Sequence, residues 1–404
     1  MTLRKDVHVT LLYPPQQTNP QWECKPEGSL AYPSLAAALL EAGFDVKIFD
    51  SCVGNEKDSL DEVFYHSSTL PSGLKRTGVS NERILDEVKD SDIVGITSVF
   101  TNQETMAIET GRLIKAHFPD KILITGGTNL RSRIQCFLDA GFDVICMSEA
   151  EPTIVSIAEQ VSERGRKWGS ISGVAFRENG KTVLRPTQIE DVVMNLDTLP
   201  LPGWEFLPNE RYWEVGRPHG AASDSGGPFR YASMMTSLGC VFKCSYCHIS
   251  GQQKGSIFGP IGKFRVKSEE RVIDEFEKLK SLGVEHLFLE DDTLFGMKKR
   301  GIDLLRKVKS FGFHMWDING INIAHLLRRD RAIGRWVPDL EVLDVLAECD
   351  FQQISLPFES GNQRILNYYA SHKWRIEDSD VAALIRALLD RGIESGGNYM
   401  IGYP

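Results

Sequence analysis

Two blocks of strand–helix alternation, separated by a proline-rich stretch, constrain the fold of this chain more than any other feature. In the first block the predicted strands are 7–12, 46–49, 93–99, 122–125 and 144–147, and the predicted helices are 34–42, 81–89, 103–118, 133–140 and 151–164. Strands joined by helices pair in parallel, because each helix returns the chain across the sheet. This block therefore predicts an α/β fold, a doubly wound five-stranded parallel sheet with helices on both faces.

The carboxyl edge of this sheet is the expected ligand site, because ligands of such sheets bind beyond the carboxyl ends of the strands. Four segments meet there, and their candidate binding residues are Tyr13, Pro14, Pro15, Ser98, Thr101, Asn102, Gly126, Gly127, Thr128, Asn129, Ser148, Glu149 and Glu151. Taken alone, Gly126-Gly127 fits a turn as well as a cofactor contact. The segment 52–80 lacks periodicity, and we expect it to be a lid or an insertion.

The second block repeats the alternation, with strands at 232–236, 286–289, 313–318, 353–358 and 398–401 and helices at 269–282, 302–311, 340–349 and 381–391. Successive βα units of this kind predict a partial (β/α) barrel of the TIM type, whose function lies at the carboxyl ends of the strands. Asn81 and Ser268 each stand at the start of a predicted helix and are expected to be N-caps.

A connector separates the two blocks. Asn179-Gly180 predicts a hairpin within 171–183, and prolines cluster from 199 to 229. The predicted domains are 1–168, a connector over 169–230, and 231–404 for the barrel.

Composition excludes several classes of protein. The 55 acidic residues outnumber the 46 basic ones, giving a net charge of −9, whereas a non-specific nucleic-acid binder is usually basic. Apolar runs such as 35–40 fall short of the roughly 20 residues that a membrane span needs. Pro14 and Pro15 follow the start too soon for a secretory signal peptide. We expect a cytoplasmic protein whose eight cysteines are thiols or metal ligands.

Three cysteines in one loop carry the sharpest chemistry. Cys240, Cys244 and Cys247 follow the first predicted barrel strand with the spacing C-x3-C-x2-C. Three thiolates suit an iron–sulfur cluster with one open iron, or a zinc ion. His248 is a poor fourth ligand, because adjacent side chains rarely converge on one tetrahedral centre. Buried free thiols or a structural zinc site remain the plain alternative.

The loop 239–247 resembles the signature of the radical S-adenosylmethionine (SAM) enzymes, C-x3-C-x-aromatic-C, with Tyr246 in the aromatic place. The resemblance implies a [4Fe-4S] cluster held by these cysteines, with SAM on its open iron. Segments 286–295 and 358–362 resemble the family's SAM-binding segments, and 399–404 resembles its strand near the adenine. The implied SAM-binding residues are Tyr246, Glu290, Asp291, Asp292, Glu359 and Ser360. Pro357 departs from the glycine usual before the ribose segment.

The first block resembles the Rossmann-like cobalamin-binding domain that precedes the barrel in one radical SAM subgroup. The matching pieces are 12–15, 125–127 and 148–153, although Ser148 and Ala150 stand where glycines are expected. The cobalt-binding pattern D-x-H-x-x-G is missing, and Leu11 replaces its glycine near His8. The resemblance therefore implies a cobalamin without a protein histidine on the cobalt.

Methylation of an unactivated carbon of a small-molecule or natural-product substrate, using SAM and methylcobalamin, is the function implied. A non-methylating cyclisation or rearrangement is the alternative, and a non-catalytic cobalamin carrier with a structural metal loop is a third hypothesis. Methylthiolation of transfer RNA fits poorly, because the remaining first-block cysteines are scattered. The family's chemistry implies an electron donor such as flavodoxin or ferredoxin. The catalytic residues themselves cannot be assigned from the sequence.

The end of the chain carries one further expectation. The fifth barrel strand stops near Pro404, whereas the family's barrel normally has six βα units. An uncovered strand at a sheet edge exposes backbone groups that proteins usually cover. We expect the natural protein to continue beyond Pro404.

Overall fold

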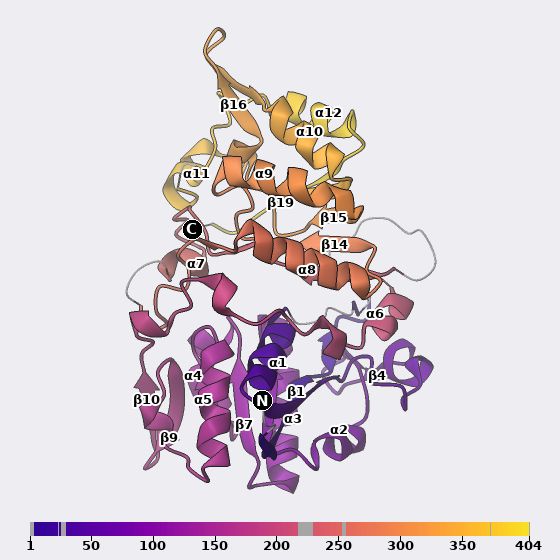
Figure 1. The fold of residues 1–404 in the computed structure, drawn as a ribbon, viewed down its shortest axis with the longest axis vertical. Coiled ribbons are helices and arrows are strands. Elements are labelled where there is room, and N and C mark those ends of the chain that lie inside the picture. The colour runs from indigo at the N-terminus through magenta and orange to yellow at the C-terminus, as the bar shows by residue number, and fades with distance from the viewer. Residues whose placement is uncertain are drawn as a thin grey trace. The chain divides into compact units, whose positions relative to one another are not determined.

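The computed structural model describes residues 4–22, 24–25, 30–216, 229–252, 256–371 and 373–403. These residues separate into two compact units (Figure 1). Unit 1 holds the described residues of 4–193, 198–216 and 257–259, and unit 2 holds those of 194–197, 229–256 and 260–403. Residues 217–228 of the predicted connector lie outside the described residues, and the domain boundaries stay a prediction.

Unit 1 is built on one seven-stranded sheet. Its strands, in spatial order, are β10 (Lys181–Arg185), β9 (Val174–Glu178), β8 (Val144–Cys146), β7 (Ile122–Gly126), β6 (Ile93–Thr97), β1 (Arg4–Tyr13) and β3 (Phe44–Asp50). The five strands from β8 to β3 are parallel, which confirms the predicted fold class. The predicted hairpin adds β9 and β10 in antiparallel pairing at the β8 edge.

Helices cover this sheet because its central strands are apolar on both faces. Every residue of β6 is buried. The helices are α1 (Ala31–Glu41), α2 (Asn81–Val88), α3 (Glu104–His117), α4 (Leu130–Asp139) and α5 (Glu151–Ser162). Helices α1 and α5 pack together, and Leu39 and Ile157 from them share one buried cluster with Val9 of β1. Ser80, not the predicted Asn81, caps α2, because its hydroxyl accepts the Arg83 amide.

The segment 52–80 is an insertion with a small sheet of its own. In this sheet β5 (Lys75–Thr77) is the middle strand and pairs antiparallel with both β4 (Ser68–Thr69) and β2 (Gln16–Thr18). A single π-helical turn, η1 (Asp61–Tyr65), precedes them. The insertion is tied to α6 (Asn209–Val215), because Arg211 donates to the carbonyls of Val53 and Asp58 at 2.7 and 2.9 Å.

Unit 2 contains a five-stranded parallel sheet in which spatial order follows chain order. Its strands are β11 (Tyr231–Met234), β14 (His286–Leu289), β15 (His314–Asp317), β18 (Phe351–Glu359) and β19 (Glu394–Tyr399). Its helices include α8 (Glu269–Ser281), α9 (Lys298–Val308), α10 (Leu340–Glu348) and α12 (Val381–Leu389). Among the described residues β19 does not pair with β11, so the sheet is a partial barrel, as predicted.

Unit 2 differs from the prediction in its last strand and in several elements that were not predicted. Strand β19 runs over Glu394–Tyr399, whereas the strand was predicted at 398–401, and Ile401 is fully exposed. The prediction was displaced because Gly396-Gly397 have no side chains to form a strand pattern in the sequence. The hairpin of β16 (Leu327–Asp330) and β17 (Arg335–Pro338) and the helix α11 (Gln363–Tyr369) were not predicted.

No helix in the described part of the chain has the length and apolarity needed to cross a membrane.

Ser268 provides a test of how local sequence starts a helix. Its hydroxyl accepts the Arg271 amide at 3.1 Å and so caps α8, as predicted. We expect Ser268→Ala to reduce the free energy of unfolding of unit 2 by about 1 kcal/mol, because an amide at the helix start loses its partner. Urea unfolding followed by circular dichroism measures this. Ser310→Ala, at an exposed residue that caps no α-helix, should change it by less than about 0.5 kcal/mol, and equal effects would contradict the assignment.

Candidate functional site

The cysteine loop begins at a glycine that follows a short strand outside the five-stranded sheet. Gly239 follows β12 (Ser237–Leu238), has a φ of +78°, and would place a Cβ 2.4 Å from the carbonyl oxygen of Lys263. Any larger residue is therefore excluded by both conformation and space. The Gly239 amide also donates to Asp292 Oδ2 at 3.0 Å, which joins the loop to the carboxyl end of β14.

Donor groups surround the sulfurs of the loop. The Thr293 hydroxyl and the Phe242 amide donate to Cys240 Sγ at 2.9 and 3.5 Å. Burial raises the pKa of the Cys247 thiol, and amides of Ile249 and Ser250 lower it. Donors of this kind stabilise sulfur in its anionic, metal-binding form and tune iron–sulfur clusters.

The thiols lie close enough to interact electrostatically, because Cys240 and Cys247 raise the pKa of Cys244 and Cys240 raises the pKa of Cys247. The donor set of three sulfurs with N–H and O–H partners fits a [4Fe-4S] cluster. Nowhere in the described ranges, however, do three or more His, Cys, Asp or Glu side chains converge in ligand geometry. The assignment of Cys240, Cys244 and Cys247 as ligands stays a prediction.

A buried ion pair lies beside the loop. Lys373 Nζ lies 2.9 Å from Glu359 Oε1, and both side chains are nearly inaccessible. The ammonium also lies 5.8 Å from the centre of the Phe242 ring, and its charge lowers the pKa of Cys244 against the effect of burial. Sequence reasoning found Glu359 but missed Lys373, which no motif marks.

Tyr246, which belongs to the loop, contacts one of the chain's last described residues. Burial and the neighbouring Glu359 raise the pKa of Tyr246, so its hydroxyl keeps its proton. Its ring packs edge-on against Tyr403 with centres 5.9 Å apart, and burial raises the pKa of Tyr403 to about 12. Ser360, half-buried, accepts the Asn362 amide at 3.1 Å and so orders the turn after β18.

The three predicted acids after β14 have different environments. Asp291 is fully buried and accepts the Thr236 amide and the hydroxyls of Thr236 and Ser237, so it holds the loop after β11. Asp292 is half-buried, and burial raises its pKa to about 6. Glu290 is also half-buried, and its carbonyl accepts the Asn319 side chain at 2.6 Å.

Asp317, at the end of β15, is an acid that sequence reasoning missed. Its side chain accepts the Gly320 amide at 2.8 Å, and burial raises its pKa to about 8. Burial therefore favours its protonated form. The signal available was its place at the carboxyl end of a barrel strand, where polar residues tend to be functional.

The carboxyl edge of the unit 1 sheet brings several predicted residues together. Asn129 Nδ2 donates to Ser98 Oγ at 3.2 Å, and the Thr101 hydroxyl lies 3.4 Å from Asn129 Oδ1. Gly127 has a φ of +129°, and a Cβ there would lie 2.4 Å from the Ser98 carbonyl oxygen. Its partner Gly126 meets no such obstacle. Gly127 alone is thus in close contact with the backbone that follows β6.

Tyr13 belongs to the same edge through a residue that was not predicted. The Gln103 side-chain amide donates to the Tyr13 hydroxyl at 2.5 Å, while its oxygen accepts the Val99 amide at 2.8 Å. Gln103 therefore links the ends of β1 and β6. Pro14 and Pro15 are buried, Thr128, Glu149 and Glu151 are half-buried, and Asn102 is exposed.

Ser148 contacts a segment distant in the sequence. Its hydroxyl donates to the Phe258 carbonyl at 3.0 Å, and the Phe258 ring lies 5.7 Å from the Arg131 guanidinium. Residues 257–259 therefore cover part of this edge. No local pattern in the sequence indicates this contact.

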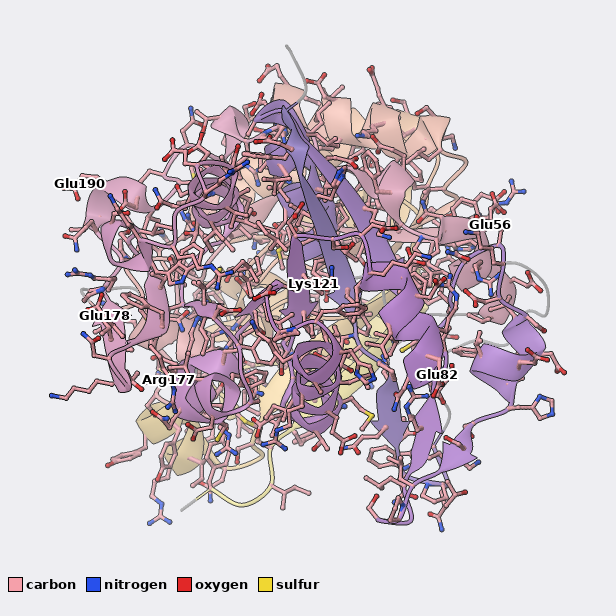
Figure 2. The ribbon with its side chains drawn as sticks, turned by 90° about the horizontal axis from the view of Figure 1, so that it is seen from below. Glu56, Glu82, Lys121, Arg177, Glu178 and Glu190 are labelled. Carbon is pink, nitrogen blue, oxygen red and sulfur yellow. The ribbon has the colours of Figure 1, made fainter. Side chains whose placement is uncertain are left out.

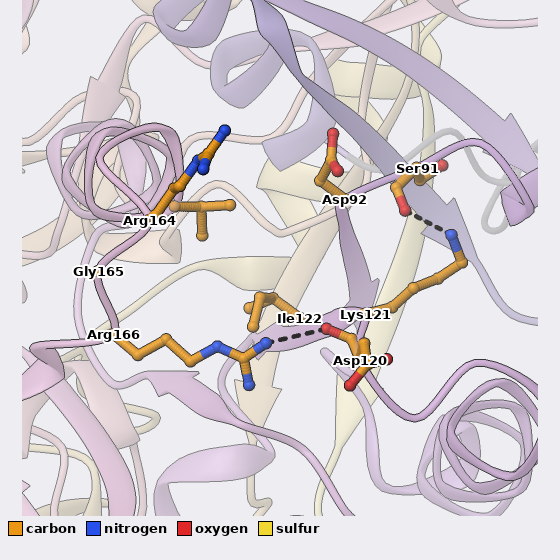
Figure 3. A pocket seen from close by; sticks show the side chains of 9 residues that line it. Ser91, Asp92, Asp120, Lys121, Ile122, Arg164, Gly165 and Arg166 are labelled. Carbon is orange, nitrogen blue, oxygen red and sulfur yellow. Dashed lines mark hydrogen bonds between the residues drawn. The ribbon is translucent and has the colours of Figure 1, made fainter.

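The opposite, amino edge of the sheet holds a pocket of about 420 Å³ (Figure 3). Lys121 is seen near the middle of this edge in Figure 2, with Arg177 and Glu178 to one side and Glu82 to the other. Lys121 Nζ donates to the carbonyls of Lys89 and Ser91 at 2.6 and 2.5 Å. These backbone carbonyls already bind the Lys121 ammonium. His8 also lies toward this edge and pairs with Asp45 at 2.7 Å, away from the expected ligand site.

Comparison with known proteins identifies the class. The family described as "Radical SAM superfamily" matches residues 234–404, which contain the cysteine loop and the partial barrel. These residues form a radical SAM domain, and the chain is an enzyme.

The relatives narrow the class. Cytidylyl-2-hydroxyethylphosphonate methyltransferase from Streptomyces wedmorensis is 24% identical over 398 residues, covering 92% of this chain and 68% of the relative. The radical SAM methyltransferase TsrM from Kitasatospora setae has the same fold in two solved structures. One, with tryptophan and a SAM analogue bound, has a TM-score of 0.68 at 15% identity and covers 98% of this chain and 68% of TsrM. The other, with cobalamin and a [4Fe-4S] cluster bound, has a TM-score of 0.67 at 16% identity and covers 99% and 69%.

The predicted resemblance to cobalamin-dependent radical SAM methyltransferases is thereby confirmed. The predicted [4Fe-4S] cluster and SAM are the cofactors of radical SAM enzymes. Cobalamin, the third predicted cofactor, is bound together with a [4Fe-4S] cluster in one of the TsrM structures.

The two glycines of unit 1 provide a matched test of the edge geometry. We expect Gly127→Ala to destabilise unit 1 by about 1–3 kcal/mol, because it adds a Cβ at positive φ against the Ser98 backbone. Gly126→Ala should be tolerated, because its nearest neighbour, the Cys146 side chain, lies at an ordinary contact distance of 3.7 Å. Thermal unfolding of the cofactor-free protein measures both. Equal stability of the two variants would contradict the close contact of Gly127 with the Ser98 backbone.

Proposed function

We propose that this protein methylates an unactivated carbon of a small-molecule substrate with the help of SAM and cobalamin. The observation that carries the proposal is the cysteine loop, anchored by Gly239 and Asp292 at the carboxyl ends of barrel strands. Two relatives that match nearly the whole chain are methyltransferases, which favours methyl transfer. When bound, the cluster and SAM supply hydrogen-atom abstraction, and cobalamin supplies methyl-transfer chemistry.

The residues of unit 2 bind and orient in this proposal. Cys240, Cys244 and Cys247 hold the cluster, with Thr293 and Phe242 donating to the first sulfur. Asp292 and Glu290 bind the amino group of SAM, whereas Asp291 already accepts hydrogen bonds from the loop after β11. Glu359 and Ser360 approach the ribose, as the family resemblance implies.

The residues of unit 1 form the proposed cobalamin site at the carboxyl edge. Ser98, Thr101 and Asn129 offer hydroxyl and amide groups there. Gly127 lets the β7 turn pass close to the backbone of β6. His8 is directed to Asp45, which supports a cobalt without a histidine from this segment.

The proposal also covers the class of substrate, the electron donor and the cellular location. The relatives act on or bind small molecules, a cytidylyl phosphonate and tryptophan respectively, so a small-molecule substrate is proposed here too. A one-electron donor such as flavodoxin or ferredoxin is required to reduce the cluster. All eight cysteines are free thiols, which is consistent with a cytoplasmic location.

The first test concerns the cluster. We expect about four irons and four sulfides per chain after anaerobic reconstitution, and loss of the brown chromophore in the triple variant Cys240→Ala/Cys244→Ala/Cys247→Ala. Iron analysis and absorption spectra measure this. The double variant Cys136→Ala/Cys349→Ala, at cysteines outside the loop, should keep its iron. Stoichiometric zinc without iron in anaerobically purified protein would refute the cluster.

The second test concerns the products. We expect each turnover to yield one S-adenosylhomocysteine and one 5′-deoxyadenosine, because the proposed reaction uses one SAM as methyl donor and another as radical source. Mass spectrometry of anaerobic reactions with SAM, cobalamin, reductant and candidate metabolites measures the ratio. Substrate-dependent 5′-deoxyadenosine without S-adenosylhomocysteine would instead establish the alternative, a cyclisation or rearrangement without methyl transfer.

A further inference from the structure

The β16–β17 hairpin carries an unusual concentration of positive charge. Arg328, Arg329, Arg331 and Arg335 lie within eight residues, and all four are exposed. Asp330 is the one acidic residue of the hairpin. The whole chain has a net charge of −9, so this hairpin opposes the charge of the molecule that bears it.

The hairpin is an ordered element. Its two strands pair over four residues, and the Trp336 amide and carbonyl bond to residues 378 and 380 at 2.8 and 2.9 Å. The Arg329 guanidinium lies 5.9 Å from the centre of the Trp336 ring. Gly334 supplies the positive φ of the turn, and Ile333 beside it is 63% exposed. The arginines are thus presented on a defined surface.

The nearby acids have other partners. Asp330 accepts the Ala332 amide at 2.9 Å, Asp378 pairs with Arg375 at 3.0 Å, and Asp380 caps α12 through the Ala383 amide at 3.0 Å. Within the described part of the chain, none of the four hairpin arginines forms an ion pair. An anionic partner would therefore meet cations that are not already neutralised.

The base of the hairpin contacts the cysteine loop. The 3₁₀ turn η8 (Ile323–His325) leads directly into β16, and the His325 ring lies 5.4 Å from the Phe242 ring. Phe242 stands between Cys240 and Cys244 in the loop. Three residue steps separate His325 from Arg328, a reach of at most about 11 Å. The basic surface therefore begins next to the proposed cluster ligands.

We propose that the β16–β17 hairpin is the docking surface for an acidic one-electron carrier protein that reduces the cluster. This inference rests on the proposed function, because the cluster chemistry requires an external electron. The carrier loses one electron and the cluster gains it, with no bond formed or broken. The negative charge elsewhere repels an acidic carrier, so the hairpin orients it toward the cysteine loop. Exposed Ile333 offers an apolar contact at the tip of the hairpin.

The test compares two triple variants of the full chain after cluster reconstitution. Arg328→Ala/Arg331→Ala/Arg335→Ala removes three hairpin charges, and Lys57→Ala/Lys181→Ala/Lys299→Ala removes three exposed charges elsewhere. We expect reduction by flavodoxin hydroquinone, followed by stopped-flow absorption at low salt, to slow at least tenfold in the hairpin variant only. The rate for the unsubstituted protein should fall with added salt. Photoreduction through a deazaflavin, which requires no docking, should be unchanged.

The other outcomes of these experiments separate a failure of the docking surface from a failure of the proposed function. Equal flavodoxin rates in all three proteins, with the cluster present, would overturn the docking surface and leave the proposed function standing. Absence of a cluster in the unsubstituted protein would refute the function itself. If the hairpin variant loses binding of a labelled RNA oligonucleotide but keeps its flavodoxin rate, the hairpin serves a polyanion and the proposal is wrong.

Discussion

The close approach of Gly239 to the backbone of Lys263 is the constraint on which the chemistry of unit 2 depends. It fixes the path of the chain after β12, and the amide of the same glycine donates to Asp292. The three cysteines and the acids after β14 are thereby kept near one another, although about 50 residues separate them in the sequence. A loop displaced at this glycine would also separate Cys240 Sγ from its Thr293 partner.

The loop lies beside a pair of opposite charges that is largely shielded from solvent. Lys373 lies beside the sulfurs, and Glu359 holds it there. A positive charge close to a cluster favours the reduced, more negative state, and a low local dielectric strengthens that effect. The same ion pair is costly to disrupt, because removal of either partner leaves a buried charge without compensation. One contact therefore contributes both to electron affinity and to the integrity of the site.

Much of this arrangement could be predicted from sequence because it is local. The apolar strands of both units, the start of α8 at Ser268 and the cysteine spacing each occupy a short stretch of chain. The features that were missed depend on distant partners. Lys373 is defined by Glu359, Gln103 by Tyr13, and the place of Phe258 by Ser148, and no periodicity records such pairs. Strand β19 was misplaced because its glycines carry no side chains to show a pattern.

Residues 257–259 lie far beyond the first block in sequence, yet they are counted with unit 1 and cover Ser148. The chain therefore enters unit 1 more than once, and neither unit is formed by one continuous segment of the sequence. A fragment cut after the first block would lack the strip that shields one end of its own sheet. Recombination by simple exchange of an N-terminal segment would meet the same obstacle, so the two halves of this enzyme are expected to have diverged together as a single inherited piece.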